Sequence, residues 1–292
     1  MKKILLTGVT GQVGQELQKT LVPLGEIVSV TRQDIDLTKP ELIRSAIAEL
    51  KPDIIINAAA YTAVDKAETE PKLATAINGV APTIMAESAQ QIGATLVHIS
   101  TDYVFNGQNY TPYTEEDRPA PLGVYGKSKL MGEEEVRNNC DRHLILRTAW
   151  VYGSRGHGNF VKTMLRLGAE REQLRVVSDQ IGSPTWSYDI ATAITQLVSN
   201  SVTGTYNFSS SGVASWYDFA VAIFSEAKQL GFPLKIKEIV PITTAEYPTP
   251  AQRPAYSVLS KVKTSQIIGN YPPHWQQSLK QMLSEWQSIV SH

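Results

Sequence analysis

Short apolar runs alternate with segments of helical periodicity through the first half of the chain. The runs have the length of buried strands, whereas the intervening segments repeat apolar positions three or four residues apart. Such an alternation is typical of a parallel sheet with helices on both faces. The predicted strands are Ile4–Leu6, Ile27–Val30, Ile54–Ile56, Leu96–Ile99 and Leu144–Leu146. The predicted helices are Val13–Leu21, Pro40–Leu50, Leu73–Ile92 with a break near Gly79–Pro82, and one that carries Tyr125 and Lys129.

The pattern becomes less regular after Trp150. Helical spacing predicts four more helices, and two further apolar runs predict strands. The helices are Phe160–Glu170, Asp189–Val198, Trp216–Leu230 and Trp275–Ile289, and the strands are Thr205–Phe208 and Ile236–Val240. We therefore expect an α/β fold with a doubly wound parallel (Rossmann) sheet in residues 1–150. Residues 151–292 are expected to form mainly a smaller substrate-binding lobe, interleaved with the first domain.

Three glycines follow the first predicted strand and open the first helix. Gly8, Gly11 and Gly14 form a Gly-x-x-Gly-x-x-Gly variant of the dinucleotide fingerprint. Glycines there permit a tight turn, close approach of the backbone to a pyrophosphate, and close packing of helix on strand. The free N–H groups of the helix N-terminus then face the pyrophosphate. The turn predicts a nicotinamide dinucleotide cofactor.

The end of the second strand bears on the choice between NADH and NADPH. An acidic residue there binds the ribose hydroxyls of NADH, whereas an arginine accepts the 2′-phosphate of NADPH. Arg32 favours NADPH, although Asp34 and Asp36 keep NADH open. The third strand ends in Asn57 and then Ala58-Ala59-Ala60, whose small side chains let a cofactor lie against the backbone.

Tyr125 and Lys129 are four residues apart and share one helical face. An ammonium beside a phenol favours the phenolate, so we expect Lys129 to lower the pKa of Tyr125. Moving a tyrosine pKa from about 10 to about 7 requires roughly 4 kcal/mol of differential stabilisation. The result is an acid/base group that works at neutral pH.

Two hydroxyl groups end the fourth predicted strand, in His98-Ile99-Ser100-Thr101-Asp102. In a doubly wound sheet this strand end lies near the helix that carries Tyr125 and Lys129. We expect Thr101 to orient a substrate carbonyl, with Ser100 nearer the cofactor. Tyr125 would donate a proton to the carbonyl oxygen as hydride arrives, and Lys129 would hold the nicotinamide ribose.

Composition excludes several other classes of protein. The 292 residues carry a net charge of −1, which gives no electrostatic reason to expect a nucleic acid or an anionic membrane as partner. The single cysteine, Cys140, excludes an internal disulfide, and its polar neighbours suggest an inert thiol at a solvated helix end. The apolar runs are too short for a signal peptide or a membrane span, so we expect a cytoplasmic protein.

Longer stretches of the sequence resemble the extended short-chain dehydrogenase/reductase superfamily, and within it the dTDP-4-dehydrorhamnose reductase family. The resemblance rests on Gly8–Gly14, Ser100–Phe105 and Tyr125–Lys129, and it spans essentially the whole chain. Further matching stretches are Asn57–Asp65, Arg147–Gly153, Asp179–Thr185 and Tyr247–Pro254. The resemblance implies NAD(P)H-dependent reduction of the 4-keto group of dTDP-4-dehydro-L-rhamnose to dTDP-L-rhamnose, a precursor of cell-surface polysaccharide.

The resemblance also implies roles for individual residues. Thr101, Tyr125 and Lys129 would be the catalytic residues. The cofactor would contact Gly8, Thr10, Gly11, Gln12, Val13, Gly14, Arg32, Asp36, Leu37, Ala58, Ala59, Ala60, Tyr61, Ser100, Tyr125 and Lys129. The sugar nucleotide would contact Thr62, Val64, Asp65, Thr101, Tyr125, Trp150, Asn159 and Arg253. An arginine suits a diphosphate because its planar fork makes paired, charge-assisted bonds.

Some members of this family join two subunits through magnesium held by glutamates. Glu16 and Glu285 match two of those positions, but the third is Tyr188, with Asp189 beside it. Magnesium prefers carboxylate and water oxygens to a phenol. We therefore expect no metal ligand here, and either a monomer or a homodimer that no metal bridges.

Two other functions fit parts of the same pattern. A sugar-nucleotide dehydratase or epimerase would share the fold and the Tyr–Lys pair, but dehydratases follow the catalytic threonine with Asp-Glu, and here Tyr103 follows Asp102. A non-catalytic regulatory subunit like that of methionine adenosyltransferase also resembles these reductases. Net consumption of NADPH separates the reductase from both.

Overall fold

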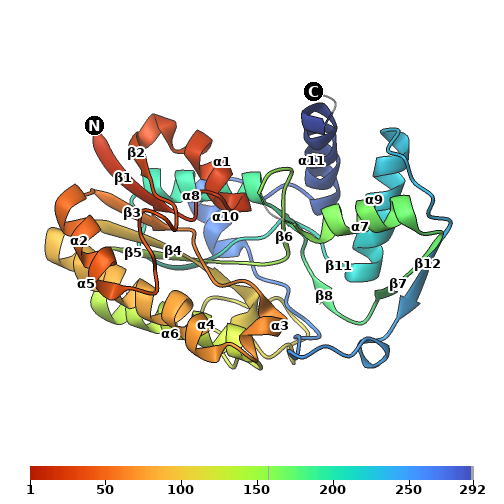
Figure 1. The fold of residues 1–292 in the computed structure, drawn as a ribbon, viewed down its shortest axis with the longest axis horizontal. Coiled ribbons are helices and arrows are strands. Elements are labelled where there is room, and N and C mark those ends of the chain that lie inside the picture. Colours follow the sequence, from red (N-terminus) through yellow and green to blue (C-terminus); the bar gives the residue numbers. More distant parts are fainter. Residues whose placement is uncertain (157, 291–292) are drawn as a thin grey trace.

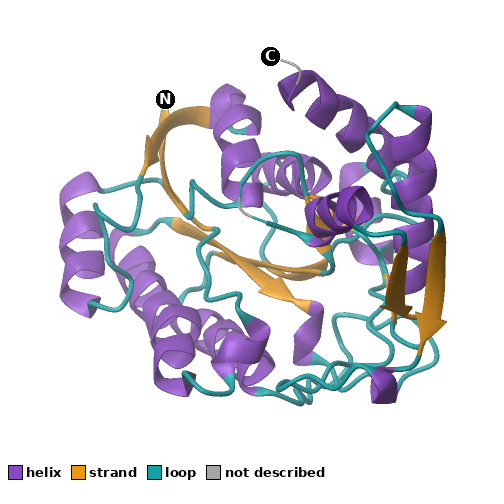
Figure 2. Ribbon diagram, turned by 45° about the vertical axis from the view of Figure 1, so that its right-hand side comes forward, coloured by secondary structure: helices purple, strands orange, loops and turns teal. Residues whose placement is uncertain are grey.

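The computed structural model describes residues 1–156 and 158–290. Six parallel strands form a central sheet in the order β10-β5-β4-β3-β1-β2. Figure 2 shows this sheet between layers of helices. The strands are β1 (Lys2–Thr7), β2 (Gly25–Ser29), β3 (Ile54–Asn57), β4 (Thr95–Thr101), β5 (His143–Thr148) and β10 (Gly204–Asn207).

The two faces of the sheet are covered by separate sets of helices (Figure 1). Successive side chains of a strand point to opposite faces, so Ile4 and Leu6 enter one core while Leu5 enters the other. One face packs against α1 (Gln12–Thr20), α8 (Ser187–Ser199) and α10 (Val262–Ile268). The opposite face packs against α2 (Pro40–Leu50), α5 (Ala81–Ile92) and α6 (Val124–Asn139). The predicted doubly wound sheet is confirmed.

The predicted break near Gly79–Pro82 is a widened helical turn instead. A π-helical turn, η2 (Ala76–Val80), joins α4 (Pro71–Thr75) to α5 without interruption. Pro82 has no N–H for the carbonyl of Asn78, and the wider turn absorbs that loss. A Cβ on Gly79 would lie 2.7 Å from the sulfur of Met131, so this turn packs closely on α6.

Much of the second half of the chain forms a smaller lobe, at the right of Figure 1. Its aromatic and aliphatic core lies among α7 (Phe160–Glu170), α9 (Trp216–Gln229) and α11 (Trp275–Val290). Beside it, β7 (Gln173–Val177) pairs in parallel with β12 (Glu238–Ile242), two residues later than the strand predicted at Ile236–Val240. The chain returns to the central sheet through α8, β10 and α10.

The remaining elements are short. The short strands are β6 (Val151–Tyr152), β8 (Ile181–Gly182), β9 (Thr185–Trp186) and β11 (Ala214–Ser215). The short helices are η1 (Val22–Leu24), α3 (Val64–Ala67), η3 (Asp102–Val104) and η4 (Thr244–Glu246). Over residues 1–156 and 158–290, no helix is both long enough and apolar enough to cross a membrane.

The expectation of a solvated Cys140 is wrong. The residue follows the last turn of α6, but its side chain is only 1% exposed and belongs to the core between the helices and the sheet. Polar neighbours in the sequence face away from that core. Burial raises the pKa of the thiol, which keeps it in its unreactive, protonated form.

A buried ion pair fastens α6 to the sheet. Arg147 of β5 donates from Nε and Nη2 to the carboxylate of Glu133, over 2.9 and 2.7 Å. Burial alone would raise the pKa of Glu133, but the bonds from Arg147 outweigh it and hold that pKa below its ordinary value. Arg137 adds a third contact of 3.1 Å from the solvent side. The pair fixes the helix that carries Tyr125 and Lys129.

Substituting Arg147→Met should destabilise the protein by about 3 kcal/mol, because it strands a buried carboxylate. Urea unfolding at neutral pH measures the loss. The double variant Arg147→Met, Glu133→Leu serves as the control and should recover much of it, because no buried charge is then left unpaired. Equal stability of Arg147→Met and the parent would contradict this account of the pair.

Candidate active site

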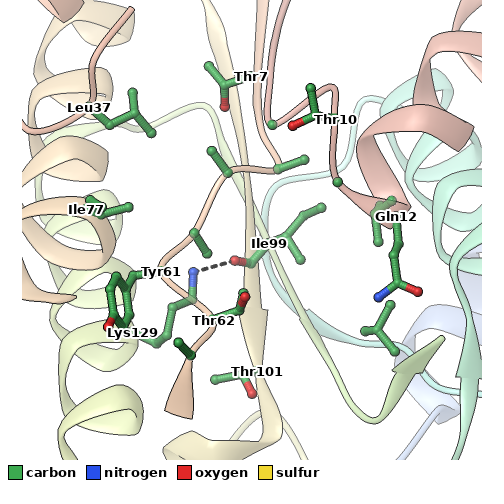
Figure 3. Close-up of a pocket in the computed structure, with 18 of the residues that line it drawn as sticks. Thr7, Thr10, Gln12, Leu37, Tyr61, Thr62, Ile77, Ile99, Thr101 and Lys129 are labelled. Carbon is green, nitrogen blue, oxygen red and sulfur yellow. Dashed lines mark hydrogen bonds between the residues drawn. The ribbon is translucent and has the colours of Figure 1, made fainter. Parts of the chain in front are cut away.

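A deep cleft of about 730 Å³ lies at the carboxyl ends of the central strands. Ligands of doubly wound sheets bind at this edge. Most residues with a predicted role line the cleft, and Figure 3 shows several of them. They are Gly8, Thr10, Gly11, Gln12, Val13, Arg32, Asp36, Leu37, Ala58, Ala59, Ala60, Tyr61, Thr62, Val64, Ser100, Thr101, Tyr125, Lys129, Trp150 and Asn159. Gly14, Asp65 and Arg253 are not part of its wall.

The glycine turn after β1 brings bare backbone to the cleft. Gly8 adopts a φ of +72°, and a Cβ there would lie 2.5 Å from backbone atoms of Ala58 and Ala59. The N–H of Gly11 donates to the carbonyl of Gly8 over 2.9 Å, and α1 begins immediately after it. No side chain caps this end of the helix, so its first N–H groups are available to an anion.

Gly14 acts in packing rather than in the wall of the cleft. A Cβ at this position would lie 2.0 Å from the carbonyl oxygen of Gly8. The absence of a side chain therefore lets α1 approach the turn that precedes it. A direct contact between Gly14 and a ligand stays a prediction.

The segment after β2 carries one cation, Arg32, and two carboxylates, Asp34 and Asp36, that are hydrogen-bonded within the segment. Asp34 accepts hydrogen bonds from the backbone and hydroxyl of Thr31, over 2.8 and 2.7 Å. Asp36 accepts two from Thr38, which lower its pKa, and the nearby charge of Arg32 lowers it further. Both carboxylates are thus held in local turns, and Arg32 lines the cleft beside Asp36 with its cation. This arrangement suits the 2′-phosphate of NADPH better than a bare ribose.

The three predicted catalytic residues meet in the wall of the cleft. Thr101 ends β4, and Tyr125 and Lys129 lie on successive turns of α6. The hydroxyl of Thr101 is hydrogen-bonded to the phenol of Tyr125. It also donates to Asp102 over 3.0 Å and accepts from the N–H of Tyr103 over 3.2 Å. Tyr103 further fixes the phenol by an edge-on ring contact with Tyr125 at 5.4 Å between centroids.

The prediction that Lys129 lowers the pKa of Tyr125 is wrong. Poor solvation of the phenolate raises the pKa of Tyr125 to about 12, despite its hydrogen bond with Thr101. Lys129 directs its nitrogen elsewhere, to the carbonyl of Ile99 at 2.7 Å (Figure 3). The same nitrogen lies 3.2 Å from Nε2 of His98. Tyr125 therefore keeps its proton at neutral pH, which is the form that a proton donor requires.

Trp150 is held rigidly at the opening toward the small lobe. Its backbone has a φ of +48°, a strained conformation for a bulky residue. The indole stacks on Trp216, with ring centroids 3.5 Å apart and planes within 3°. A Cβ at Gly182 would lie 2.4 Å from the indole, so that glycine leaves the space the ring occupies. The half-buried ring offers the cleft a fixed apolar surface.

The side chain of Asn159 is already occupied by the protein. Its Oδ1 accepts from the N–H of Lys162 over 3.0 Å and caps α7. Its Nδ2 donates to Gln12 over 2.7 Å and to the carbonyl of Gly153 over 2.8 Å. Asn159 therefore joins the small lobe to the glycine turn while it also lines the cleft, and its direct contact with a ligand stays a prediction.

Asp65 and Arg253 form a pair beside the cleft. Arg253 donates to both carboxylate oxygens of Asp65, over 2.8 and 3.1 Å, and this lowers the pKa of Asp65. Arg253 also bonds the carbonyl of Ala251 over 3.0 Å and the hydroxyl of Thr249. The pair ties α3 of the main domain to the C-terminal segment. Neither residue presents a free charge to a ligand in this arrangement.

The glutamates discussed for magnesium are neutralised by cations of the chain itself. Glu16 lies 2.8 Å from Lys19, and Arg155 lies between Glu16 and Glu285 at 3.9 and 3.7 Å. Asp189 accepts from Ser278 over 2.6 Å. Within the described part of the chain, no three His, Cys, Asp or Glu side chains gather as metal ligands would. These residues do not fit a magnesium ion.

Two buried polar groups next to the catalytic residues received no role from the sequence. Burial raises the pKa of Asp102 to about 6, although its hydrogen bonds draw it back toward the ordinary value. His98 is fully buried in the middle of β4, directly behind Lys129. The only signal for His98 is a polar residue within the apolar run Leu96–Ile99.

Comparison with known proteins identifies relatives over nearly the whole chain. The family model of the RmlD substrate binding domain matches residues 1–288. A dTDP-4-dehydrorhamnose reductase of Escherichia coli K12 is 44% identical over 291 residues, which is 97% of each chain.

Two solved structures are similarly close. A dTDP-4-dehydrorhamnose reductase of Clostridium acetobutylicum shares 41% identity and a TM-score of 0.91, over 98% of this chain and 99% of that one. A dTDP-4-dehydrorhamnose reductase of Bacillus anthracis in complex with NADP shares 40% identity and a TM-score of 0.91, over 97% and 99% of the chains.

Substituting Gly8→Ala should weaken NADP⁺ binding at least about tenfold, because a Cβ strains the turn and meets the backbone of Ala58. Isothermal titration calorimetry measures the affinity. Gly93→Ala is a matched control, since Gly93 has a φ of +70° and no atom within 4 Å of its added Cβ. Unchanged affinity in Gly8→Ala, or an equal loss in both variants, would refute the role of the glycine turn in binding the dinucleotide.

Proposed function

The chain belongs to the dTDP-4-dehydrorhamnose reductase family, and we infer that its cleft reduces the 4-keto group of dTDP-4-dehydro-L-rhamnose with NADPH to give dTDP-L-rhamnose. The observation that carries this inference is the bond between Thr101 and Tyr125 in the wall of a cleft that the glycine turn opens. It puts a hydroxyl and a protonated phenol on one side of a site built for a dinucleotide.

The residues around the glycine turn fit NADPH. The uncapped N-terminus of α1 suits the pyrophosphate, and the close approach of Gly8 to Ala58 leaves room for it along the backbone. Arg32 suits the 2′-phosphate, because a guanidinium makes paired bonds to phosphate oxygens. Bound NADPH supplies the hydride that reduces the carbonyl carbon.

The side chains of the cleft supply the proton and the orientation. Tyr125 donates its phenolic proton to the carbonyl oxygen, and this neutralises the charge that develops on that oxygen. Thr101 positions the same oxygen and fixes the phenol through their mutual hydrogen bond. Lys129 is anchored on the carbonyl of Ile99, from where its nitrogen reaches the cleft wall.

We place the sugar nucleotide toward the small lobe. Trp150 supports this assignment, because its rigid indole provides an apolar face against which a deoxysugar packs. Thr62 and Val64 also line the cleft. Asn159 would act by holding the two lobes together, and Arg253 would reach the diphosphate only if its pairing with Asp65 opened.

The alternative chemistries find less support in these residues. The dehydratases of this superfamily follow the catalytic threonine with Asp-Glu, and here Tyr103 takes the place of that glutamate after Asp102. A purely regulatory role leaves the hydrogen-bonded Thr101–Tyr125 pair without a purpose. We place the reductase in the cytoplasm, where its cofactor is available, as a monomer or as a homodimer that no metal bridges.

Substituting Tyr125→Phe should lower kcat about 100- to 10,000-fold, because the proton donor is lost while the ring remains. The rate is followed by the nicotinamide absorbance with dTDP-4-dehydro-L-rhamnose and NADPH, and calorimetry should show unchanged NADP⁺ binding. Tyr103→Phe is the matched control, because it removes a neighbouring phenol and should retain most of the rate. Near-parental turnover of Tyr125→Phe would rule out the proton donor.

Substituting Arg32→Ala should raise KM for NADPH about tenfold or more and leave KM for NADH within about twofold, because only NADPH carries the 2′-phosphate. Steady-state kinetics with each cofactor measure the ratio. Lys39→Ala, which removes a cation from the same connection but not from the cleft wall, should leave both KM values unchanged. A parallel loss with both cofactors would argue against the phosphate contact.

A further inference from the structure

We propose that the buried ring of His98 directs its Nε2–H at the nitrogen of Lys129 and thereby stabilises the uncharged amine over the ammonium. His98 is then a positioning residue that acts on the reaction through Lys129. The meaning for catalysis rests on the proposed reductase function, but the protonation states themselves can be measured without turnover.

The direction of the Asn57 amide is the first step. The backbone N–H of Ala59 lies 3.3 Å from Oδ1 of Asn57, and a backbone N–H can only donate. The hydroxyl of Thr7 donates to the same oxygen over 2.9 Å. The amide nitrogen of Asn57 must therefore face the other way, where Nδ1 of His98 lies 3.2 Å from it.

The tautomer of His98 follows from that direction. The amide group of Asn57 can only donate through its nitrogen, so Nδ1 of His98 must accept and carries no proton. The ring is 0% exposed, and burial is the main cause that holds its pKa well below the ordinary value. A neutral ring has one N–H, and this N–H is therefore on Nε2.

The protonated Nε2 lies 3.2 Å from Nζ of Lys129. An ammonium has three donors and no acceptor, so it would oppose this N–H, whereas a neutral amine accepts from it. Nζ still donates to the carbonyl of Ile99 over 2.7 Å, which an amine can do equally (Figure 3). A Cβ at Gly132 would lie 3.3 Å from Nε2, so α6 packs directly on the ring and holds it in place.

Other charges near Lys129 do not cancel the effect of the His98 N–H, which favours the amine over the ammonium. Burial lowers the pKa of Lys129 to about 8, and the carboxylate of Glu133 opposes this shift. Glu133 is itself neutralised by Arg147, 2.7 Å away. The titratable groups that act on Lys129 directly are His98 on β4 and Glu133 on α6, and Arg147 on β5 acts on it through Glu133.

A lysine with a lowered pKa can change its charge during the reaction. Tyr125 becomes a phenolate when it gives its proton to the carbonyl oxygen, and a nearby ammonium stabilises a phenolate. Because its pKa is about 8, Lys129 exchanges its proton with solvent close to neutral pH, and any fraction present as the amine takes up a proton at that stage and becomes this ammonium. His98 therefore brings the pKa of Lys129 closer to neutral, so that the charge of Lys129 can change at the stage at which Tyr125 gives up its proton.

The tautomer can be read directly in the parent protein by NMR of ring nitrogens after labelling the five histidines with ¹⁵N. The signals that disappear in His98→Leu are those of His98. We expect Nε2 to show the shift of a protonated nitrogen and Nδ1 that of an unprotonated one at pH 7. The reverse pattern, or a doubly protonated ring, would overturn the proposal.

The effect on Lys129 is measured from the ¹³Cε and ¹⁵Nζ shifts of labelled lysine across the pH range, in the parent and in His98→Leu. Removing the opposing N–H should raise the pKa of Lys129 by about one unit. A fall would mean that His98 accepts from an ammonium, and no shift would mean that it has no influence. Either result refutes the proposal.

Ser128→Ala is the matched control for the lysine titration. Ser128 is a buried neighbour of Lys129 on α6 that bonds Asn78 over 3.1 Å, and its loss should leave the titration unchanged. An equal shift in both variants would attribute the effect to a general disturbance of α6. Failure of the reductase assay with a confirmed tautomer would count against the proposed function alone.

Discussion

The anchoring of Lys129 from beneath the cleft is the interaction on which the rest of the site depends. Its nitrogen lies 2.7 Å from the carbonyl of Ile99, so a backbone group of β4 fixes the height of α6 over the sheet. Tyr125 is one turn earlier on the same helix, and Thr101 is two residues beyond Ile99 on the same strand. This bond between helix and strand therefore helps to hold Tyr125 and Lys129 in place relative to Thr101.

Close approach of backbones makes this arrangement accessible to ligands. Glycines lie where the helices come closest to neighbouring elements. Gly14 of α1 packs against Gly8, and Gly132 of α6 packs against Asn78 and His98. The buried pair of Glu133 and Arg147 then holds α6 in this position at its far end. A chain of polar groups from Thr7 through Asn57 and His98 runs under the floor between these contacts, so the cleft is supported by hydrogen bonds as well as by packing.

Sequence patterns predict the features that depend on local order. Apolar runs such as Ile54–Ile56 predict buried strands, and Gly8–Gly14 predicts the glycine turn between β1 and α1. Features that depend on contacts distant in sequence could not be predicted in this way. Cys140 lies in a core that its polar neighbours do not enter. Asn159 donates a hydrogen bond to Gln12 of α1, which lies far from it in the sequence.

The error about Tyr125 has the same origin. Spacing of four residues puts Lys129 on the correct face of the helix, but it does not say where the nitrogen points. Desolvation of the phenol and the competing carbonyl of Ile99 decide the outcome, and both come from β4 and its surroundings.

The central claim is that Tyr125 is a protonated phenol at neutral pH. It is tested most directly by the ¹³Cζ shift of Tyr125 in tyrosine-labelled protein, assigned with Tyr125→Phe and followed from pH 6 to pH 10. Because its pKa is about 12, we expect the shift of a neutral phenol throughout this range. A transition to the phenolate shift with a midpoint near pH 7 would contradict the account.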